Sequence, residues 1–240
     1  NCDWSSDVCS SDLPSLSGST LDAAHDASLG IHESQSRMLE NLVGRSRAFW
    51  TAYYPKLQKA FPSQLNGVEL ETFYGAINKV ERSLIRVEAD EATYNLHILL
   101  RFEIEADLIE GKIEVADLPD VWNSRFEEYL GLVPPDDGQG VLQDVHWSDG
   151  YFGYFPTYTL GNLISVQLWR KVNADIPDLE TQISKGDFGE LIAWLRENVH
   201  RHGGKYEPME VLKRATGEEL SAKPYLDYLT EKYSEIYGLS

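Results

Sequence analysis

The chain has 240 residues, which is enough for one large domain or two small ones with a substantial core. Its 39 acidic and 21 basic residues give a formal charge of −18, which disfavours general binding to a nucleic-acid backbone. No apolar run approaches the roughly 18 residues that a membrane-spanning helix needs, so we expect no membrane partner. Both cysteines lie in the first thirteen residues. A disulfide framework is therefore excluded for the rest of the chain, which suits a cytoplasmic location.

The opening segment, NCDWSSDVCSSDL, differs from everything that follows it. It shows no helical or strand period, and it lacks the charged start and apolar stretch of a secretory signal. It resembles the in-frame translation of a DNA-sequencing adapter. We therefore interpret residues 1–13 as a scar that is not native, and we expect the natural chain to extend further upstream of Pro14.

The first native-looking segment is helical in pattern. Apolar residues recur at helical spacing from about residue 20 to residue 60, with Pro55 expected to bend or restart the helix. A second amphipathic helix is predicted over residues 67–84.

The rhythm changes at residues 85–89, where apolar and polar side chains alternate in the sequence IRVEA. A period of two is typical of a short strand. Asp90 is expected to cap the following helix, which is predicted over residues 91–111 and ends at Gly111.

The remaining pattern is again mostly helical. A helix is predicted over residues 117–132, with Pro119 in its first turn and Gly131 near its end. Residues 141–158 are rich in aromatic side chains and have no clean period, which is typical of a shaped loop. Four further helices are predicted within residues 159–173, 188–203, 208–217 and 224–238. The sequence thus predicts a mainly α fold with a minor short strand, and residues 14–240 as a single helical unit.

The segment HESQSRMLEN places Glu33, Arg37 and Glu40 on one helix face, at i, i+4 and i+7. An exposed ladder of ion pairs is the ordinary interpretation of such a pattern. The functional interpretation makes Glu33 a metal ligand that neighbouring side chains hold in orientation. The six histidines include no i, i+4 pair of the H-E-x-x-H kind, so spacing alone does not decide between the two.

In LIRVEADE, Arg86 has two equally supported interpretations. It can pair with Glu88 or Asp90 and tie this segment to the next helix. Alternatively, its planar guanidinium can hold a carboxylate with two hydrogen bonds.

In GVLQDVHW, the residues Gln143, Asp144 and His146 fall within four positions and precede Trp147. A lone histidine is by default a buried structural residue. Three polar side chains beside a glycine-rich aromatic loop also fit the lining of a cleft. The pair His200 and His202, at a helix end, is expected to be solvated.

Three segments together resemble the carboxypeptidase Taq family of zinc metallocarboxypeptidases: GIHESQSRMLENLVGRSRAFW, LIRVEADEATYNLHILLRFEIE and GVLQDVHWSDGYFGYFPTYTLGN. They occur in the family's order, and the similarity covers residues 18–240. The resemblance implies a mainly helical, zincin-like enzyme that removes single residues from the C-termini of peptides, often as a homodimer.

The resemblance also implies roles for individual residues. Glu33 in HESQ matches the family's third zinc ligand, and Arg86 in IRVEAD matches the arginine that holds the terminal carboxylate of the substrate. The residues of GxxQDxHW match a motif of the active-site wall. There Gln143 and Asp144 would contact substrate, and His146 would support the oxyanion of the transition state.

One departure from the family is decisive for this chain. The H-E-x-x-H helix, with two histidine ligands and the glutamate that acts as general base, precedes HESQ in the family and is absent here. Zinc chemistry needs three protein ligands and an open position for water. We therefore expect residues 14–240 to be the C-terminal part of a truncated catalytic domain. We expect this part alone to be inactive and not to bind zinc, or cobalt in place of zinc, stably.

A rival hypothesis comes from another class of protein. In it the chain is a non-catalytic all-α interaction or regulatory protein, whose charges are surface ladders and whose aromatic loop binds a partner. The enzyme hypothesis instead predicts that Glu33, Arg86 and His146 face one cavity and that an apolar face is left exposed.

Overall fold

A computed structural model describes residues 29–239 of the chain. The expectation for residues 1–13 therefore lies outside the described residues. The described part is mainly helical, as predicted, and contains no strand. It divides into two compact units: unit 1 holds the described residues up to Tyr74 and from Leu160 on, and unit 2 is Gly75–Thr159. The single helical unit expected for residues 14–240 stays a prediction.

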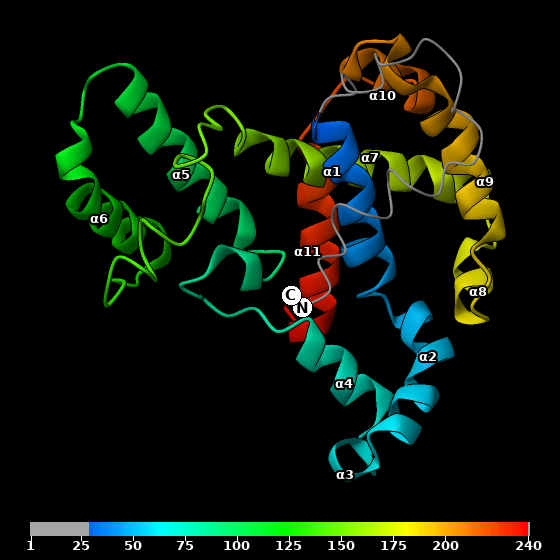
Figure 1. Ribbon diagram of the computed structural model, residues 1–240. Helices are drawn as coiled ribbons and strands as arrows, with labels where there is room; N and C mark the ends of the chain where they lie inside the picture. The colour runs from blue at the N-terminus through cyan, green and yellow to red at the C-terminus, as the bar shows by residue number, and fades with distance from the viewer. Residues whose placement is uncertain (1–28, 240) are drawn as a thin grey trace. The chain divides into compact units, whose positions relative to one another are not determined.

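Unit 1 is built from helices at both ends of the chain, which can be followed in Figure 1. They are α1 (Leu29–Arg37), which continues into a π-helical turn (Met38–Val43), α2 (Arg47–Ala60), α3 (Pro62–Leu65), most of α4 (Leu70–Ile77), most of α7 (Pro156–Asp175), α8 (Leu179–Ser184), α9 (Gly189–Asn198), a 3₁₀ segment (His200–Lys205), α10 (Pro208–Thr216) and α11 (Lys223–Tyr237).

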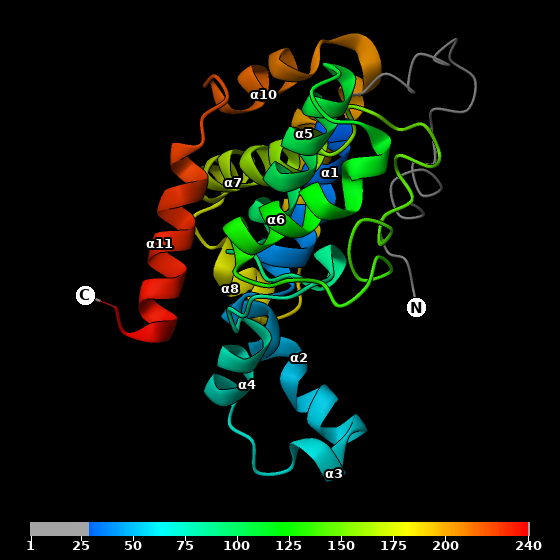
Figure 2. The same ribbon diagram turned by 90° about the vertical axis from the view of Figure 1, so that its left-hand side faces the viewer.

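The core of unit 1 joins residues that are far apart in the sequence. Ile31 and Met38 from the first segment pack with Ile164 and Leu168 of α7 and with Leu212 of α10. Figure 2 shows α10 and α11 as the last elements of the chain. The ends of α10 follow local rules, because Pro208 opens the helix and Gly217, at φ 82°, closes it in a left-handed conformation.

Unit 2 contains α5 (Tyr94–Ile109) and α6 (Leu118–Leu130), which pack side by side, and two 3₁₀ turns (Arg86–Glu88 and Val115–Asp117). On α6, Trp122, Phe126 and Leu130 recur every four residues and are fully buried. They pack on Leu100 and Ile104 of α5. This spacing puts the apolar side chains on one face, which explains why the segment folds as a helix against α5.

The strand predicted over residues 85–89 is wrong. The segment forms a 3₁₀ turn at Arg86–Glu88. Val87, an apolar position of the alternating pattern, is 72% exposed, whereas Arg86, a polar position, is only 5% exposed. The reason is that Arg86 pairs with Asp144, 58 residues further along the chain. This buried ion pair, and not an alternating apolar face, orders the segment.

Several helix boundaries also differ from the prediction. Pro55 lies inside α2 and does not interrupt it, and the break comes earlier, where Ser46 caps α2 by accepting a hydrogen bond from the Phe49 N–H. The helix predicted over residues 67–84 is limited to α4. No helix in the described part of the chain is long and apolar enough to cross a membrane.

Candidate active site

Glu33 lies on α1 in unit 1, and its carboxylate is held by donors from the same helix. Arg37 Nε donates to Oε1 at 2.7 Å, and Ser36 Oγ donates to Oε2 at 3.1 Å. The side chain is only 17% exposed. Both carboxylate oxygens are therefore oriented by neighbouring donors, as a metal ligand requires.

The predicted ion-pair ladder is present as well. Arg37 also contacts Glu40 at 3.2 Å, and the Glu40 side chain is half exposed. The ladder therefore has one solvated end at Glu40 and one largely buried end at Glu33. Glu33 thus belongs to the ion-pair ladder and is also largely buried. Both interpretations fit this arrangement, so its role as a metal ligand stays a prediction.

His200 was expected to be solvated, and this is wrong. Its Nε2 lies 3.0 Å from Gln35 Oε1, and Gln35 Nε2 donates to Ser34 Oγ at 2.9 Å. Because Ser34 Oγ donates its own hydrogen to the Ile31 carbonyl, it accepts the hydrogen bond from the Gln35 amide nitrogen. The amide oxygen Oε1 of Gln35 therefore faces His200 and accepts a hydrogen bond from its Nε2–H. Burial, followed by Arg196 and His32, lowers the pKa of His200.

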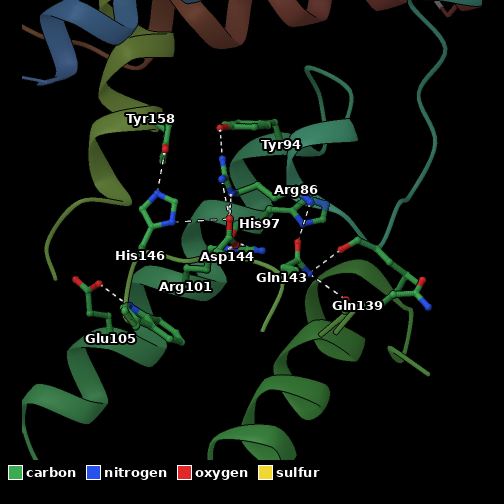
Figure 3. A network of polar contacts seen from close by, with 12 residues as sticks. Arg86, Tyr94, His97, Arg101, Glu105, Gln139, Gln143, Asp144, His146 and Tyr158 are labelled. Atoms are coloured by element: carbon green, nitrogen blue, oxygen red, sulfur yellow. Dashed lines mark hydrogen bonds and ion pairs between the residues drawn. The ribbon is translucent and has the colours of Figure 1, made fainter. Parts of the chain in front are cut away.

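In unit 2, Arg86 is paired with Asp144, 58 residues further along the chain (Figure 3). Its Nε and Nη2 donate to the same oxygen, Oδ1, at 3.0 and 2.7 Å. Its Nη1 donates to the Tyr94 hydroxyl at 2.9 Å, and the guanidinium lies 4.7 Å over the Tyr158 ring. The partner is thus neither Glu88 nor Asp90, the two local candidates.

Arg101 of α5 is a second cation on the same carboxylate, which the sequence did not reveal. Its Nε donates to Asp144 Oδ2 at 2.6 Å, and its Nη1 donates to the His97 carbonyl at 2.8 Å. Its side chain is fully buried and lies over the Trp122 ring. Asp144 is therefore the shared counter-ion of two buried arginines.

Gln143 fixes the backbone beside Arg86. Its Oε1 accepts a hydrogen bond from the Arg86 N–H at 3.0 Å, and its Nε2 donates to the carbonyls of Leu84 and Gln139. Its polar atoms thus hold the turn that carries Arg86. The substrate contacts expected of Gln143 and Asp144 stay predictions.

His146 is brought into the same cluster. Its Nε2 lies 3.0 Å from the Tyr158 hydroxyl, and its Nδ1 lies 3.9 Å from Asp144 Oδ1. Tyr158 stands in the first turn of α7, in the aromatic segment that the sequence marked only as a loop or wall. The structure therefore unites Arg86, Asp144, His146 and Gln143 in unit 2, and adds Arg101 and Tyr158.

The charges of the cluster shift its titrations. Burial raises the pKa of Asp144, but Arg101 and Arg86 outweigh burial and hold it below its ordinary value. Burial lowers the pKa of Arg101 to about 10. For Arg86 burial is again the largest influence, yet Tyr94 and Asp144 give a net rise in its pKa. Burial lowers the pKa of His146, so its imidazole is neutral at pH 7.

The loop that carries His146 is anchored by Glu105 of α5. Trp147 Nε1 donates to Glu105 Oε2 at 2.9 Å, and the Gly153 N–H donates to Oε1. Glu105 is buried and has no cationic partner in these bonds. Two donors six residues apart in the aromatic loop thus meet on one carboxylate, which explains how an aperiodic segment is ordered.

His97 offers a pH-dependent prediction for stability. It is fully buried, neither ring nitrogen has a hydrogen-bond partner in the described chain, and burial followed by Arg101 lowers its pKa to about 3. Between pH 6.5 and 3 the unfolded state takes up a proton that the folded state does not. The contribution of His97 to the free energy of unfolding is therefore fully present above pH 6.5. Between pH 6.5 and pH 3 it falls by about 1.4 kcal/mol per pH unit.

The substitution His97→Leu should remove this contribution. Urea unfolding of both proteins at pH 7 and pH 4.5 measures it, because the carboxylates titrate alike in the two. We expect the variant to lose less stability on acidification than the parent. Equal losses would show that His97 does not titrate in this way.

The described residues include no group of three or more His, Cys, Asp or Glu side chains that could hold a metal ion. Glu33 fits one oxygen ligand by its chemistry, its partial burial and its oriented oxygens. Glu33 lies in unit 1 and the arginine cluster in unit 2, so the convergence of the two stays a prediction.

Comparison with known proteins identifies relatives along almost the whole chain. Residues 14–233 match the family described as carboxypeptidase Taq (M32) metallopeptidase. The chain is 47% identical to carboxypeptidase 1 of Bacillus subtilis over 93% of its own length and 44% of that protein. It is 50% identical to thermostable carboxypeptidase 1 of Thermus thermophilus over 88% of its length and 41% of that protein.

A solved structure gives the same result. The crystal structure of the M32 carboxypeptidase from Deinococcus radiodurans R1 matches with a TM-score of 0.85 and 52% identity, over 88% of this chain and 43% of that one. The chain thus spans less than half the length of these relatives. On the family match and these identities, the chain belongs to the carboxypeptidase Taq (M32) family of metallopeptidases.

Proposed function

We propose that this chain supplies part of a zinc carboxypeptidase that releases single residues from the C-termini of peptides. The observation that carries the proposal is the state of Arg86. Three of its five N–H groups donate to Asp144 and Tyr94, and the remaining two, one on each terminal nitrogen, have no acceptor in the described chain. An arginine that keeps N–H donors on its terminal nitrogens can hold the carboxylate of a ligand by charged hydrogen bonds.

The cluster around Arg86 supports the same role. Asp144 and Tyr94 fix the guanidinium, so little side-chain freedom is lost when a terminal carboxylate binds. Neutral His146, hydrogen-bonded to Tyr158, is a candidate donor to an oxyanion that develops on the scissile carbonyl. Neither role needs a change in the protonation of the cluster.

For the metal, we propose zinc, with Glu33 as one ligand and two histidines from an H-E-x-x-H segment upstream. Zinc in such a site supplies a Lewis acid and a water of lowered pKa. Because one carboxylate does not hold zinc, we propose that the 240-residue chain alone is inactive. A cytoplasmic location and a homodimer complete the proposal for the whole protein, by analogy with its family.

The direct test compares two proteins. One is the chain as it stands. The other, the extended protein, replaces residues 1–13 by the segment that the genomic DNA encodes directly upstream of the Pro14 codon, joined to residues 14–240. We expect the extended protein to hydrolyse an N-blocked dipeptide with a free C-terminus when zinc or cobalt is added, and not the C-terminal amide. The chain alone should be inactive. An extended protein without metal-dependent hydrolysis would favour the non-catalytic interaction protein instead.

Arg86→Lys tests the carboxylate role in the extended protein. Lysine keeps the charge and loses the planar pair of donors, so we expect KM for the free dipeptide to rise about 10- to 100-fold, the loss of one or two charged hydrogen bonds, with a smaller change in kcat. Arg82→Lys is the control, since Arg82 donates only to the Leu130 carbonyl in unit 2. Similar KM values in both variants would contradict the assignment.

A further inference from the structure

Gly161 lies inside α7, where a glycine weakens a helix relative to alanine. Its surroundings give a reason for it. A β-carbon at this position would lie 2.5 Å from Glu33 Cγ, 2.7 Å from Glu33 Cβ and 3.0 Å from the Glu33 carbonyl carbon. Its three nearest neighbours thus all belong to the one residue that we propose as a metal ligand.

These contacts cannot be relieved by rotating the end of a side chain. Cβ and the carbonyl carbon of Glu33 move only with α1 itself, and ordinary contacts of a β-carbon begin near 3.4 Å. Any side chain at position 161 would therefore push α1 away from α7, which cross in unit 1 (Figure 1). The push would act at the base of the Glu33 side chain.

We propose that Gly161 is a positioning residue, whose missing side chain sets the place of the Glu33 carboxylate. The proposal rests on the proposed function, in which Glu33 binds the metal. Metal–ligand distances tolerate only about 0.2 Å of change, so a displacement of α1 by several tenths of an ångström is large on this scale. Arg37 and Ser36 orient the carboxylate, and Gly161 fixes the distance of its helix from α7.

The first test uses the 240-residue chain and thermal unfolding. We expect Gly161→Ala to lower Tm, and the matched control Gly75→Ala, in α4 with nothing within 4 Å of its added β-carbon, to leave Tm unchanged or raise it. In a Glu33→Gly background, which removes the Cβ and Cγ contacts, the loss caused by Gly161→Ala should shrink. If Gly161→Ala does not fold, recovery of folding in the double variant is the expected result. If Gly161→Ala lowers Tm as much in the Glu33→Gly background as in the parent, or if the double variant does not fold, the proposed contact between position 161 and Glu33 is overturned.

The second test separates positioning from packing, in the extended protein with zinc affinity as the readout. Gly161→Ala should raise the zinc Kd at least 10-fold. Val172→Ala, which removes buried volume from the same helix, should lower Tm and leave the zinc Kd unchanged.

The outcomes distinguish the two proposals. If Glu33→Gln leaves the zinc Kd unchanged, the ligand role of Glu33 fails. If Glu33→Gln weakens zinc binding and Gly161→Ala does not, the ligand role stands and the positioning role of Gly161 is overturned.

Discussion

Replacing Asp144 by asparagine is expected to lower the free energy of unfolding by about 3–5 kcal/mol, the cost of removing one partner from a buried ionic group. Asparagine has nearly the same shape, so the loss reflects charge and hydrogen bonding. Arg101 is fully buried and Arg86 nearly so, and both rely on this one carboxylate. In the variant an amide would also meet N–H donors where an oxygen accepted them. Urea unfolding at pH 7 measures the change.

An exposed pair of the same geometry provides the control. Glu210 Oε1 accepts hydrogen bonds from Nε and Nη2 of Arg214, as Asp144 Oδ1 does from Arg86, but both side chains of the exposed pair are nearly half exposed. We expect Glu210→Gln to change stability little, because solvent screens the pair. A loss for Asp144→Asn no larger than that for Glu210→Gln would show that the buried cluster does not depend on this charge.

The second large effect is expected for metal binding by the extended protein. Glu33→Gln should weaken zinc binding by more than the roughly 10- to 100-fold that follows loss of a partner outside the ligand set, because it removes a ligand itself. Arg37→Met, which takes away the donor to Oε1, should fall within that range. Competition with a chromophoric chelator measures the three Kd values.

Glu40→Gln is the matched control for Glu33→Gln. It also removes an acidic residue from the ladder on Arg37, but its side chain is half exposed. We expect no change in the zinc Kd. Equal changes in the zinc Kd for the two variants would show that Glu33 contributes only its negative charge and is not a metal ligand.

The helices could be predicted where local signals define them. Pro119 stands at the start of α6, and Gly131, at φ 65°, ends it. Between them Trp122, Phe126 and Leu130 recur at the helical period and belong to a core cluster of unit 2. These signals act within a few residues of the chain, so the sequence displays them directly.

The predicted strand failed because its order comes from distant residues. Arg86 is buried because Gln143 and Asp144 lie beside it, 57 and 58 residues further along the chain. An alternating pattern carries no information on such partners. The family resemblance identified Arg86, Asp144 and His146 as related residues, although their spacing alone left each with an ordinary structural interpretation.

For three further residues, Arg101, Tyr158 and Gly161, the sequence contains no signal that identifies the partner. Arg101 follows an apolar stretch on α5, and nothing in its neighbourhood marks it as buried. Tyr158 is one of several aromatic residues in its segment, and only the fold shows that it is hydrogen-bonded to His146. Gly161 is a single glycine in a helix, a pattern that points to close packing without naming the partner.

The central claim is that Glu33 binds the catalytic metal of the extended protein. A crystal structure of that protein grown with zinc, with the metal located by anomalous scattering, tests it most directly. We predict zinc with a Glu33 carboxylate oxygen at about 2.0–2.2 Å and two histidine nitrogens completing the protein ligands. Zinc bound elsewhere, with Glu33 contacting only Arg37 and Ser36, would contradict the claim.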